Sequence, residues 1–341
     1  MRQMGTGTRR GSRPLRGLVG VAVATGALVG AGLMAAPAQA RPAPDATAAC
    51  VGQDGASNAR VRGGGNLAAE PNNVSAAVAA QAQRALTARV QAAGTTARGM
   101  AARADKGGYG KRAFRIPVRL HIILRDDGSG GPTRAMIWDQ IRVLNQAYAG
   151  RTSSDSSRSP FRFFVKSIDR TRNSDWYDWS VYEDTDDEEA KAALHKGSLR
   201  DLNIYITGLG DGLLGYATFP FDGELVSDGV VLLNESLPGG LAAPYNEGDT
   251  ATHEVGHWLG LFHTFEGGCV EPGDYVDDTP AQLDGDNIFF CNESDNTCPA
   301  PGTDPVHNFM SYGDDPCLDR YTRGQVARQI ATWLVYRSGL Y

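Results

Sequence analysis

Lysine and arginine are absent from residues 201–319, although this stretch carries 22 aspartate and glutamate residues. The balance is reversed near the amino terminus: residues 1–112 hold 15 lysines and arginines against 4 acidic residues, and residues 113–341 hold 18 against 35. Nucleic acids need clustered cations to neutralise their phosphates, so the acidic body excludes a nucleic-acid partner. Its field serves solubility alone or favours partners of the opposite sign, such as basic peptide segments and hard cations like calcium.

Long hydrophobic runs are also scarce, and none after residue 40 is long enough to cross a membrane. The first 40 residues combine several arginines, a weakly apolar core over residues 18–34 and the small-residue site Ala38-Gln39-Ala40, which together predict a secretory signal peptide. A single transmembrane anchor fits less well, because glycine and alanine dilute the core. We therefore expect a secreted, extracellular protein without membrane contact once the signal is removed.

Residues 41–112 are rich in alanine, arginine and glycine, and they contain one predicted helix, residues 71–91. Three glycines and Lys111-Arg112 follow this helix, a composition typical of a flexible, protease-sensitive linker. The sequence thus predicts a signal peptide over residues 1–40, a propeptide and linker over 41–112, and a catalytic domain over 113–341. The last segment is long enough for one hydrophobic core.

The most informative pattern is the run His253-Glu254-Val255-Gly256-His257-Trp258-Leu259-Gly260-Leu261-Phe262-His263. Residues four apart share a helix face, so His253 and His257 can bind one metal ion. Gly260 tolerates the positive φ of a helix end, which allows His263 to return as the third ligand. Three protein ligands leave a fourth position for water, and this is typical of a catalytic zinc site.

Glu254 follows the first histidine and would lie beside the metal, where it can accept a proton from the attacking water. A bare HExxH motif can also be a pair of polar histidines on a helix surface. Here five fixed positions are filled in order by a chain with only 6 histidines, which argues against that alternative.

Downstream, Asn308-Phe309-Met310-Ser311-Tyr312 places a methionine in a tight segment. A lone methionine usually fills a core, but after this histidine motif Met310 is similar to the Met-turn that underlies zinc in metzincins. Together with His263-Thr264-Phe265, Gly267-Gly268-Cys269 and the run DYVDDTP at residues 274–280, the pattern resembles the pappalysin family, in its smaller secreted branch. Family members often carry an acidic residue where Ser311 stands.

The resemblance implies a metzincin-type zincin of the α+β class, with a twisted mixed sheet and helices above the cleft and a loop-rich lower subdomain closed by disulfides. It implies that Tyr312 lies near the zinc and can donate to the developing oxyanion, with packing as the alternative role. It also implies bound calcium, for which the nearest oxygen-rich cluster is Asp274, Asp277, Asp278 and Thr279.

Periodicity supports the same fold class. Residues 116–124 alternate as a half-buried strand should, with His121 as an ordinary strand residue, and Thr133 can cap a helix that buries Ile137, Ile141, Leu144 and Tyr148. Further strands are predicted at residues 161–168, 202–206, 215–219 and 229–233, and further helices at 186–195 and 322–337. This order suits a mixed sheet backed by helices. By the resemblance, residues 215–220 correspond to the edge strand that lines the substrate cleft.

Four of the five cysteines, Cys269, Cys291, Cys298 and Cys317, lie in the loop-rich stretch and predict two disulfides in an exported chain. Four cysteines allow three pairings; the resemblance favours Cys269 with Cys298 and Cys291 with Cys317. A cysteine metal site is the alternative, but the CxxC spacing is missing.

Cys50, inside the predicted propeptide, is the odd thiol. It is either inert or paired between molecules, or its thiolate occupies the open zinc position and keeps the precursor latent. The resemblance supports the second reading, because cysteine-switch latency occurs among metzincin zymogens, although the surrounding residues do not match the best-known switch motif.

These features predict a secreted zinc endopeptidase, made as a latent precursor, that cuts proteins or peptides with basic residues near the scissile bond. One rival is a non-catalytic, zinc-stabilised extracellular binding module, but such a module gains nothing from Glu254. Another is a metal-dependent amidase acting on small substrates. An edge strand able to pair with a peptide backbone would favour the protease.

Overall fold

The computed structural model describes residues 60–61, 74–105, 114–180, 186–210 and 212–339. Every element below belongs to the unit Gly52–Tyr341. The predicted signal peptide, Cys50 and the pair Lys111-Arg112 lie outside the described residues.

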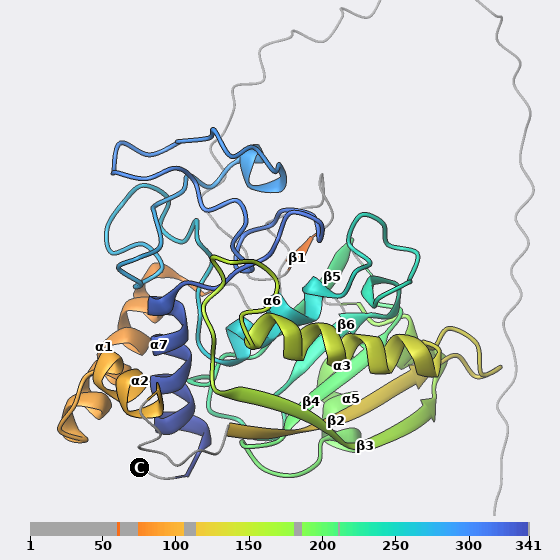
Figure 1. Ribbon diagram of the computed structural model, residues 1–341. Coiled ribbons are helices and arrows are strands. Elements are labelled where there is room, and N and C mark those ends of the chain that lie inside the picture. Colours follow the sequence, from red (N-terminus) through yellow and green to blue (C-terminus); the bar gives the residue numbers. More distant parts are fainter. Residues whose placement is uncertain (1–59, 62–73, 106–113, 181–185, 211, 340–341) are drawn as a thin grey trace, which may run out of the picture. The chain divides into compact units, whose positions relative to one another are not determined.

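One mixed sheet carries the strands in the order β1-β5-β6-β4-β2-β3 (Figure 1). Strands β2 (Phe114–Leu124), β3 (Phe161–Arg172), β4 (Leu202–Thr207) and β6 (Val230–Leu233) pair in parallel with one another. Strand β5 (Leu213–Ala217) pairs antiparallel with β6. Strands β4 and β6 are buried along their whole length, as parallel strands covered on both faces should be. The predicted mixed sheet is confirmed.

Strand β1 (Arg60–Val61) adds to the outer side of β5, where Arg60 pairs antiparallel with Gly215 and Val61 with Leu213. The sequence predicts β5 as the edge strand, so this partner from the amino-terminal segment is a difference. An edge strand presents unpaired N–H and C=O groups, which any extended segment can bind.

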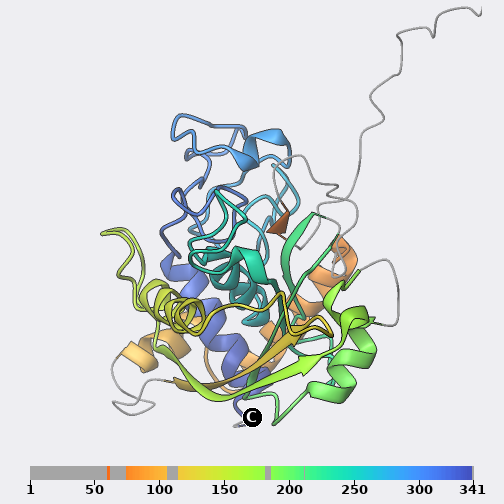
Figure 2. The ribbon, with the colours of Figure 1, turned by 90° about the vertical axis from the view of Figure 1, so that its right-hand side faces the viewer.

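Helices cover both faces of the sheet. Helix α3 (Arg134–Tyr148) begins as predicted at Thr133, whose hydroxyl accepts a hydrogen bond from the backbone N–H of Met136, and it buries the predicted apolar face. Helix α6 (Asp249–Trp258) packs against α3, β5 and β6. Helix α5 (Asp186–Leu194) lies on the opposite face from α3 (Figure 2), and the short α4 (Ser174–Tyr177) contacts α5 and β2.

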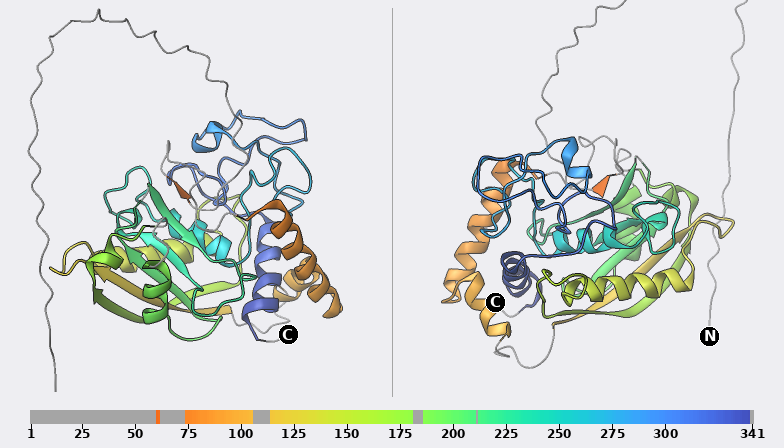
Figure 3. Two further views of the ribbon diagram at one scale, coloured as in Figure 1. Left: turned by 180° about the vertical axis from the view of Figure 1, so that it is seen from behind. Right: turned by 45° about the horizontal axis from the view of Figure 1, so that its top comes forward.

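The carboxyl-terminal helix α7 (Arg323–Thr332) begins with a capping box between Thr322 and Gln325, and it continues as a π-helix over Trp333–Arg337. Helices α1 (Ala76–Ala92) and α2 (Ala97–Asp105) run beside it (Figure 3). Their residues Leu86, Val90 and Met100 are buried in the same apolar core as the sheet. Part of the predicted propeptide therefore packs on the body, while the domain boundaries stay a prediction.

Residues 260–322 are mostly loops, with one short 3-10 turn over Asp286–Phe289. Disulfides join Cys269 to Cys298 and Cys291 to Cys317, which is the pairing that the resemblance implies. Such bonds stabilise a region with little core of its own, as predicted for the lower subdomain. Within the described residues, no helix is long and apolar enough to span a bilayer.

Candidate metal centre

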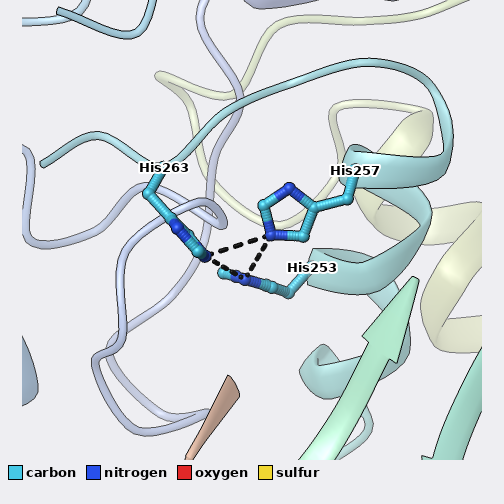
Figure 4. Close-up of side chains that lie close together, drawn as sticks. All are labelled: His253, His257 and His263. Carbon is cyan, nitrogen blue, oxygen red and sulfur yellow. Dashed lines mark hydrogen bonds between the residues drawn. The ribbon is translucent and has the colours of Figure 1, made fainter. Parts of the chain in front are cut away.

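Helix α6 presents His253 and His257 one turn apart, and the loop that follows returns His263 to the same point (Figure 4). Gly260 ends the helix with a φ of 88°, as the sequence predicts. A Cβ at Gly260 would also lie 2.8 Å from the side chain of Thr332 in α7. Glycine is thus required here both for the turn and for the packing.

The three imidazoles converge through their Nε2 atoms. The separations are 3.0 Å between His253 and His257, 3.1 Å between His253 and His263, and 3.1 Å between His257 and His263. All three side chains are fully buried. The structure therefore brings together the residues that the sequence predicts as metal ligands.

Hydrogen bonds at the other ring nitrogen fix the tautomers of His253 and His257. His253 donates from Nδ1 to the carbonyl of Phe309 at 2.6 Å, and His257 donates from Nδ1 to the carbonyl of Leu261 at 2.8 Å. Because a carbonyl only accepts, each Nδ1 carries the proton and each Nε2 carries a lone pair. The ring of His263 stacks on Phe265, with centroids 4.6 Å apart.

The Nε2 lone pairs of His253 and His257 face one another in a buried site and repel unless a cation lies between them. Zinc–nitrogen bonds of about 2.0–2.1 Å in a tetrahedral arrangement require nitrogens about 3.3 Å apart, close to the spacing here. Burial lowers the pKa of His257 to about 4 and holds the pKa of His263 well below its ordinary value. Both rings are thus neutral, the form that binds a metal, and the donor set fits zinc.

Glu254 is fully buried beside strand β5. A Cβ at Gly215 would lie 3.0 Å from Cγ of Glu254 and 2.9 Å from the carbonyl oxygen of Val231. Only glycine at this strand position leaves room for the Glu254 side chain between α6 and β5. Glycine inside a strand often marks such a close approach, but the sequence cannot say to what.

Met310 and Tyr312 are both fully buried near helix α6. A Cβ at Gly256 would collide with the sulfur of Met310, so this methionine packs directly against α6 between the two helical histidines. The ring of Tyr312 lies 4.8 Å from that of His263 and 5.7 Å from that of His253. Met310 therefore packs on the helix that carries His253 and His257, and Tyr312 packs on the rings of His253 and His263, while the roles of both residues stay predictions.

The predicted calcium cluster does not converge on one point. Asp278 caps α7, accepting from the hydroxyl of Thr322 at 2.7 Å and the backbone N–H of Gly324 at 2.8 Å. Asp277 is exposed and pairs with Arg98 of α2 at 3.4 Å. Only Asp274 is buried, and burial raises its pKa to about 7. Thr279 follows in the same loop.

One other group in the described part of the chain has ligand types at metal-binding distance: Cys291, His307 and Cys317. Its two cysteines form a disulfide, so they offer no thiolate. The cysteine metal site considered from the sequence is therefore absent from the described residues.

The sequence did not predict the groups that orient the histidine rings, border Glu254 or cap helix α6. These are the carbonyls of Phe309 and Leu261, Gly215, and a buried carboxylate, Asp315, at the start of α6. No spacing rule connects them to the histidine motif. A buried aspartate shortly after the Met-turn is the nearest available signal.

The profile of the family described as pregnancy-associated plasma protein-A matches residues 185–333. An extracellular metalloprotease of Podospora anserina is 37% identical over 289 residues, which cover 81% of this chain and 91% of that one. Extracellular metalloprotease 1 of Coccidioides posadasii is 38% identical over 231 residues, which cover 66% of this chain and 78% of the length of that protein.

Among solved structures, mature mirolysin of Tannerella forsythia in complex with a cleaved peptide is 30% identical, with a TM-score of 0.53, over 63% of this chain and 89% of its own. A mutant of promirolysin from the same organism is 28% identical, with a TM-score of 0.56, over 66% of this chain and 82% of its own.

The contact between Gly215 and Glu254 predicts a variant with a selective defect. Gly215→Ala should displace the carboxylate and lower kcat for peptide hydrolysis about 10- to 100-fold, because small misplacements of reacting groups are costly. Bound metal per chain, measured by atomic absorption, should stay unchanged. Gly210→Ala is the control, since its Cβ would lie at an ordinary 3.4 Å from the nearest atom, the carbonyl of Trp179. Equal activity in both variants would contradict the assigned contact.

Proposed function

This chain belongs to the pappalysin family of extracellular metalloproteases, and from that premise we propose that it is a secreted zinc endopeptidase with Glu254 as general base, made as a latent precursor. The observation that carries the proposal is the set of three buried imidazoles whose Nε2 atoms converge, with a buried glutamate on the same helix as two of them.

His253, His257 and His263 would hold the zinc. When bound, zinc polarises the scissile carbonyl and lowers the pKa of the attacking water. Phe309 and Leu261 keep two of the rings in the metal-binding tautomer through their carbonyls.

Glu254 would accept the proton of the attacking water and later pass it to the leaving amine. Tyr312 would donate to the oxygen that becomes negative, and packing against the histidine rings is its alternative role. A peptide substrate would pair antiparallel with β5, as β1 does, which brings its backbone alongside Glu254.

Two alternative functions fit the structure less well than a peptidase does. A binding module has no use for a carboxylate next to its metal, and an amidase for small substrates has no use for a strand that pairs with a peptide. Mature mirolysin is bound to a cleaved peptide, which supports peptide substrates for this chain.

Two substitutions should separate the role of base from the role of ligand. Glu254→Ala should keep zinc and lose peptide hydrolysis about 10²- to 10⁴-fold, because only proton transfer is removed. His257→Ala should lose the metal as well, because two ligands remain. Zinc content and casein hydrolysis are measured side by side in the two variants and the unmutated protein. Full activity in the Glu254 variant would refute the mechanism.

We propose that substrates carry lysine or arginine near the scissile bond, because residues 201–319 provide acidic side chains and no lysine or arginine. Digestion of a proteome-derived peptide library should show basic residues enriched around the cut. The enrichment should weaken between about 0.05 and 0.5 M salt as screening increases. Cut sites rich in aspartate and glutamate would exclude this preference.

We propose one structural calcium site at Asp274. Its Oδ1 accepts from the N–H of Val276 at 2.9 Å, and burial raises the pKa of Asp274 overall to about 7, although a hydrogen bond with the Thr279 side chain lowers that pKa. A buried carboxylate is costly, and calcium would offset that cost. A calcium-selective chelator should lower the Tm by about 5 °C without removing zinc, and Asp274→Asn should lose this response. A chelator-independent Tm in the unmutated protein would rule the site out.

We propose that residues 1–40 are the signal peptide, 41–112 the propeptide and linker, and 113–341 the catalytic domain. The pairing of β1 with β5 supports latency, because this leader strand occupies the side of β5 where a substrate would bind, and it also contacts α6. The similar promirolysin is named as a precursor form. Cys50 precedes Arg60 by about ten residues, so an extended chain can span roughly 35 Å between them.

If the Cys50 thiolate blocks the open metal position, the Cys50→Ala precursor should hydrolyse peptide at once or process itself faster. The unmutated precursor should stay silent until a thiol-modifying reagent or trimming near Lys111-Arg112 releases the metal. Both precursors are purified under conditions that block processing, and initial rates are compared. Equal latency would assign the block to the leader backbone and leave Cys50 without a role.

A further inference from the structure

Helix α6 is intrinsically weak, although it carries two metal ligands and the proposed base. Its ten residues, DTATHEVGHW, include two threonines, a valine, a glycine and two histidines, all poor helix formers. Isolated helices shorter than about 12–15 residues do not persist in water. At its start, Gly248 has a φ of 104° and supplies no side-chain cap. Contacts from elsewhere must therefore hold the two ends.

Asp315 supplies the missing cap at the amino-terminal end. Its Oδ2 accepts from the backbone N–H groups of Glu247 at 2.7 Å, Gly248 at 2.9 Å and Asp249 at 3.4 Å. The side chain is buried, with 2% of the residue exposed. A carboxylate at this end faces the positive pole of the helix dipole, where charge-assisted bonds are strongest.

Arg337 supplies a donor at the carboxyl-terminal end. Its Nε donates to the carbonyl of Trp258 at 2.9 Å, and its guanidinium carbon lies 3.7 Å from the centroid of the Trp258 rings. Its two terminal nitrogens pair with the carboxylate of Asp228 at 2.9 Å each. The Trp258 indole N–H also donates to Asp228 at 3.0 Å. Arg337, Asp228 and Trp258 thus connect the last turn of α6 to the turn before β6 and to the π-helix after α7.

One stretch of chain carries both Asp315 and the carbonyl that orients His253. Phe309, whose carbonyl orients His253, and Asp315 lie six residues apart on one segment, with the Met310 sulfur packed against Gly256 between them. A shift of α6 along its axis would break the bond at Asp315 and the bond at Phe309 together. The segment after the histidine motif therefore sets the position of the helix.

We propose that Asp315 and Arg337 are positioning residues that clamp opposite ends of α6 and thereby fix the metal ligands and Glu254 relative to β5. The proposal rests on the proposed function for its effect on catalysis. Neither residue touches the imidazoles of the metal site; each acts through the backbone of the helix.

Asp315→Asn tests the clamp, because it removes the charge and keeps the shape. In the full chain, release of zinc to a chelator should be about tenfold faster, and the visible spectrum of the Co²⁺-substituted protein should change. In the active form, kcat should fall about 10- to 100-fold while KM stays within about twofold. All measurements are made well below the unfolding temperature. Asp314→Asn, the adjacent half-buried aspartate, is the matched control and should behave like the unmutated protein.

Arg337→Lys is the second variant, because it keeps the charge but loses the Nε donor and the forked pair with Asp228. It should also release zinc faster. Hydrogen exchange of the α6 amides in the metal-free chain should speed up in both variants, a readout that needs no activity. Variants that lower only the Tm, with exchange in α6, zinc release, spectrum and kcat unchanged, would overturn the clamp. An unmutated protein that neither binds zinc nor cuts peptides would instead overturn the proposed function, and the exchange measurement would still decide the clamp.

Discussion

Three imidazole Nε2 atoms held 3.0–3.1 Å apart in the buried interior form the constraint on which the rest of the structure depends. Neutral imidazoles in this arrangement repel one another, and the protein imposes it by binding the far side of the rings. Carbonyls of Phe309 and Leu261 hold two of them, and a stacked Phe265 orients the third. The folded chain thus stores an unfavourable cluster that a divalent cation relieves, a common basis for tight metal binding.

Imposing that cluster requires a rigid frame around a weak helix. Strands β5 and β6 and helix α3 pack against α6, and the loops over residues 260–322 contact it through Phe309, Met310 and Asp315. Those loops contain little core, so the two disulfides limit their freedom. The segment from Phe309 to Asp315, and Arg337 in the π-helix after α7, then connect the loops and this last helical stretch to both ends of α6.

One property of β5 would serve both the proposed peptide recognition and the proposed latency. Its outer backbone groups can pair with any extended chain, and in the structure Arg60 and Val61 pair with them. Helices α1 and α2 meanwhile bury Leu86 and Met100 on the body. The segment before residue 106 therefore has two attachments of different physical kinds, one through backbone pairing with β5 and one through apolar packing near α7.

The sequence by itself determined the features that depend on near neighbours: the ligand spacing from His253 to His263, the turn at Gly260, the cap at Thr133 and the periodic faces of the main elements. Only the tertiary structure decided that Gly215 borders Glu254, that Asp315 caps α6, that β1 covers β5, and that Asp277 and Asp278 turn to separate partners. Spacing encodes which residues share a face of one element, whereas contacts between distant segments depend on how whole elements pack, and no local pattern records that packing.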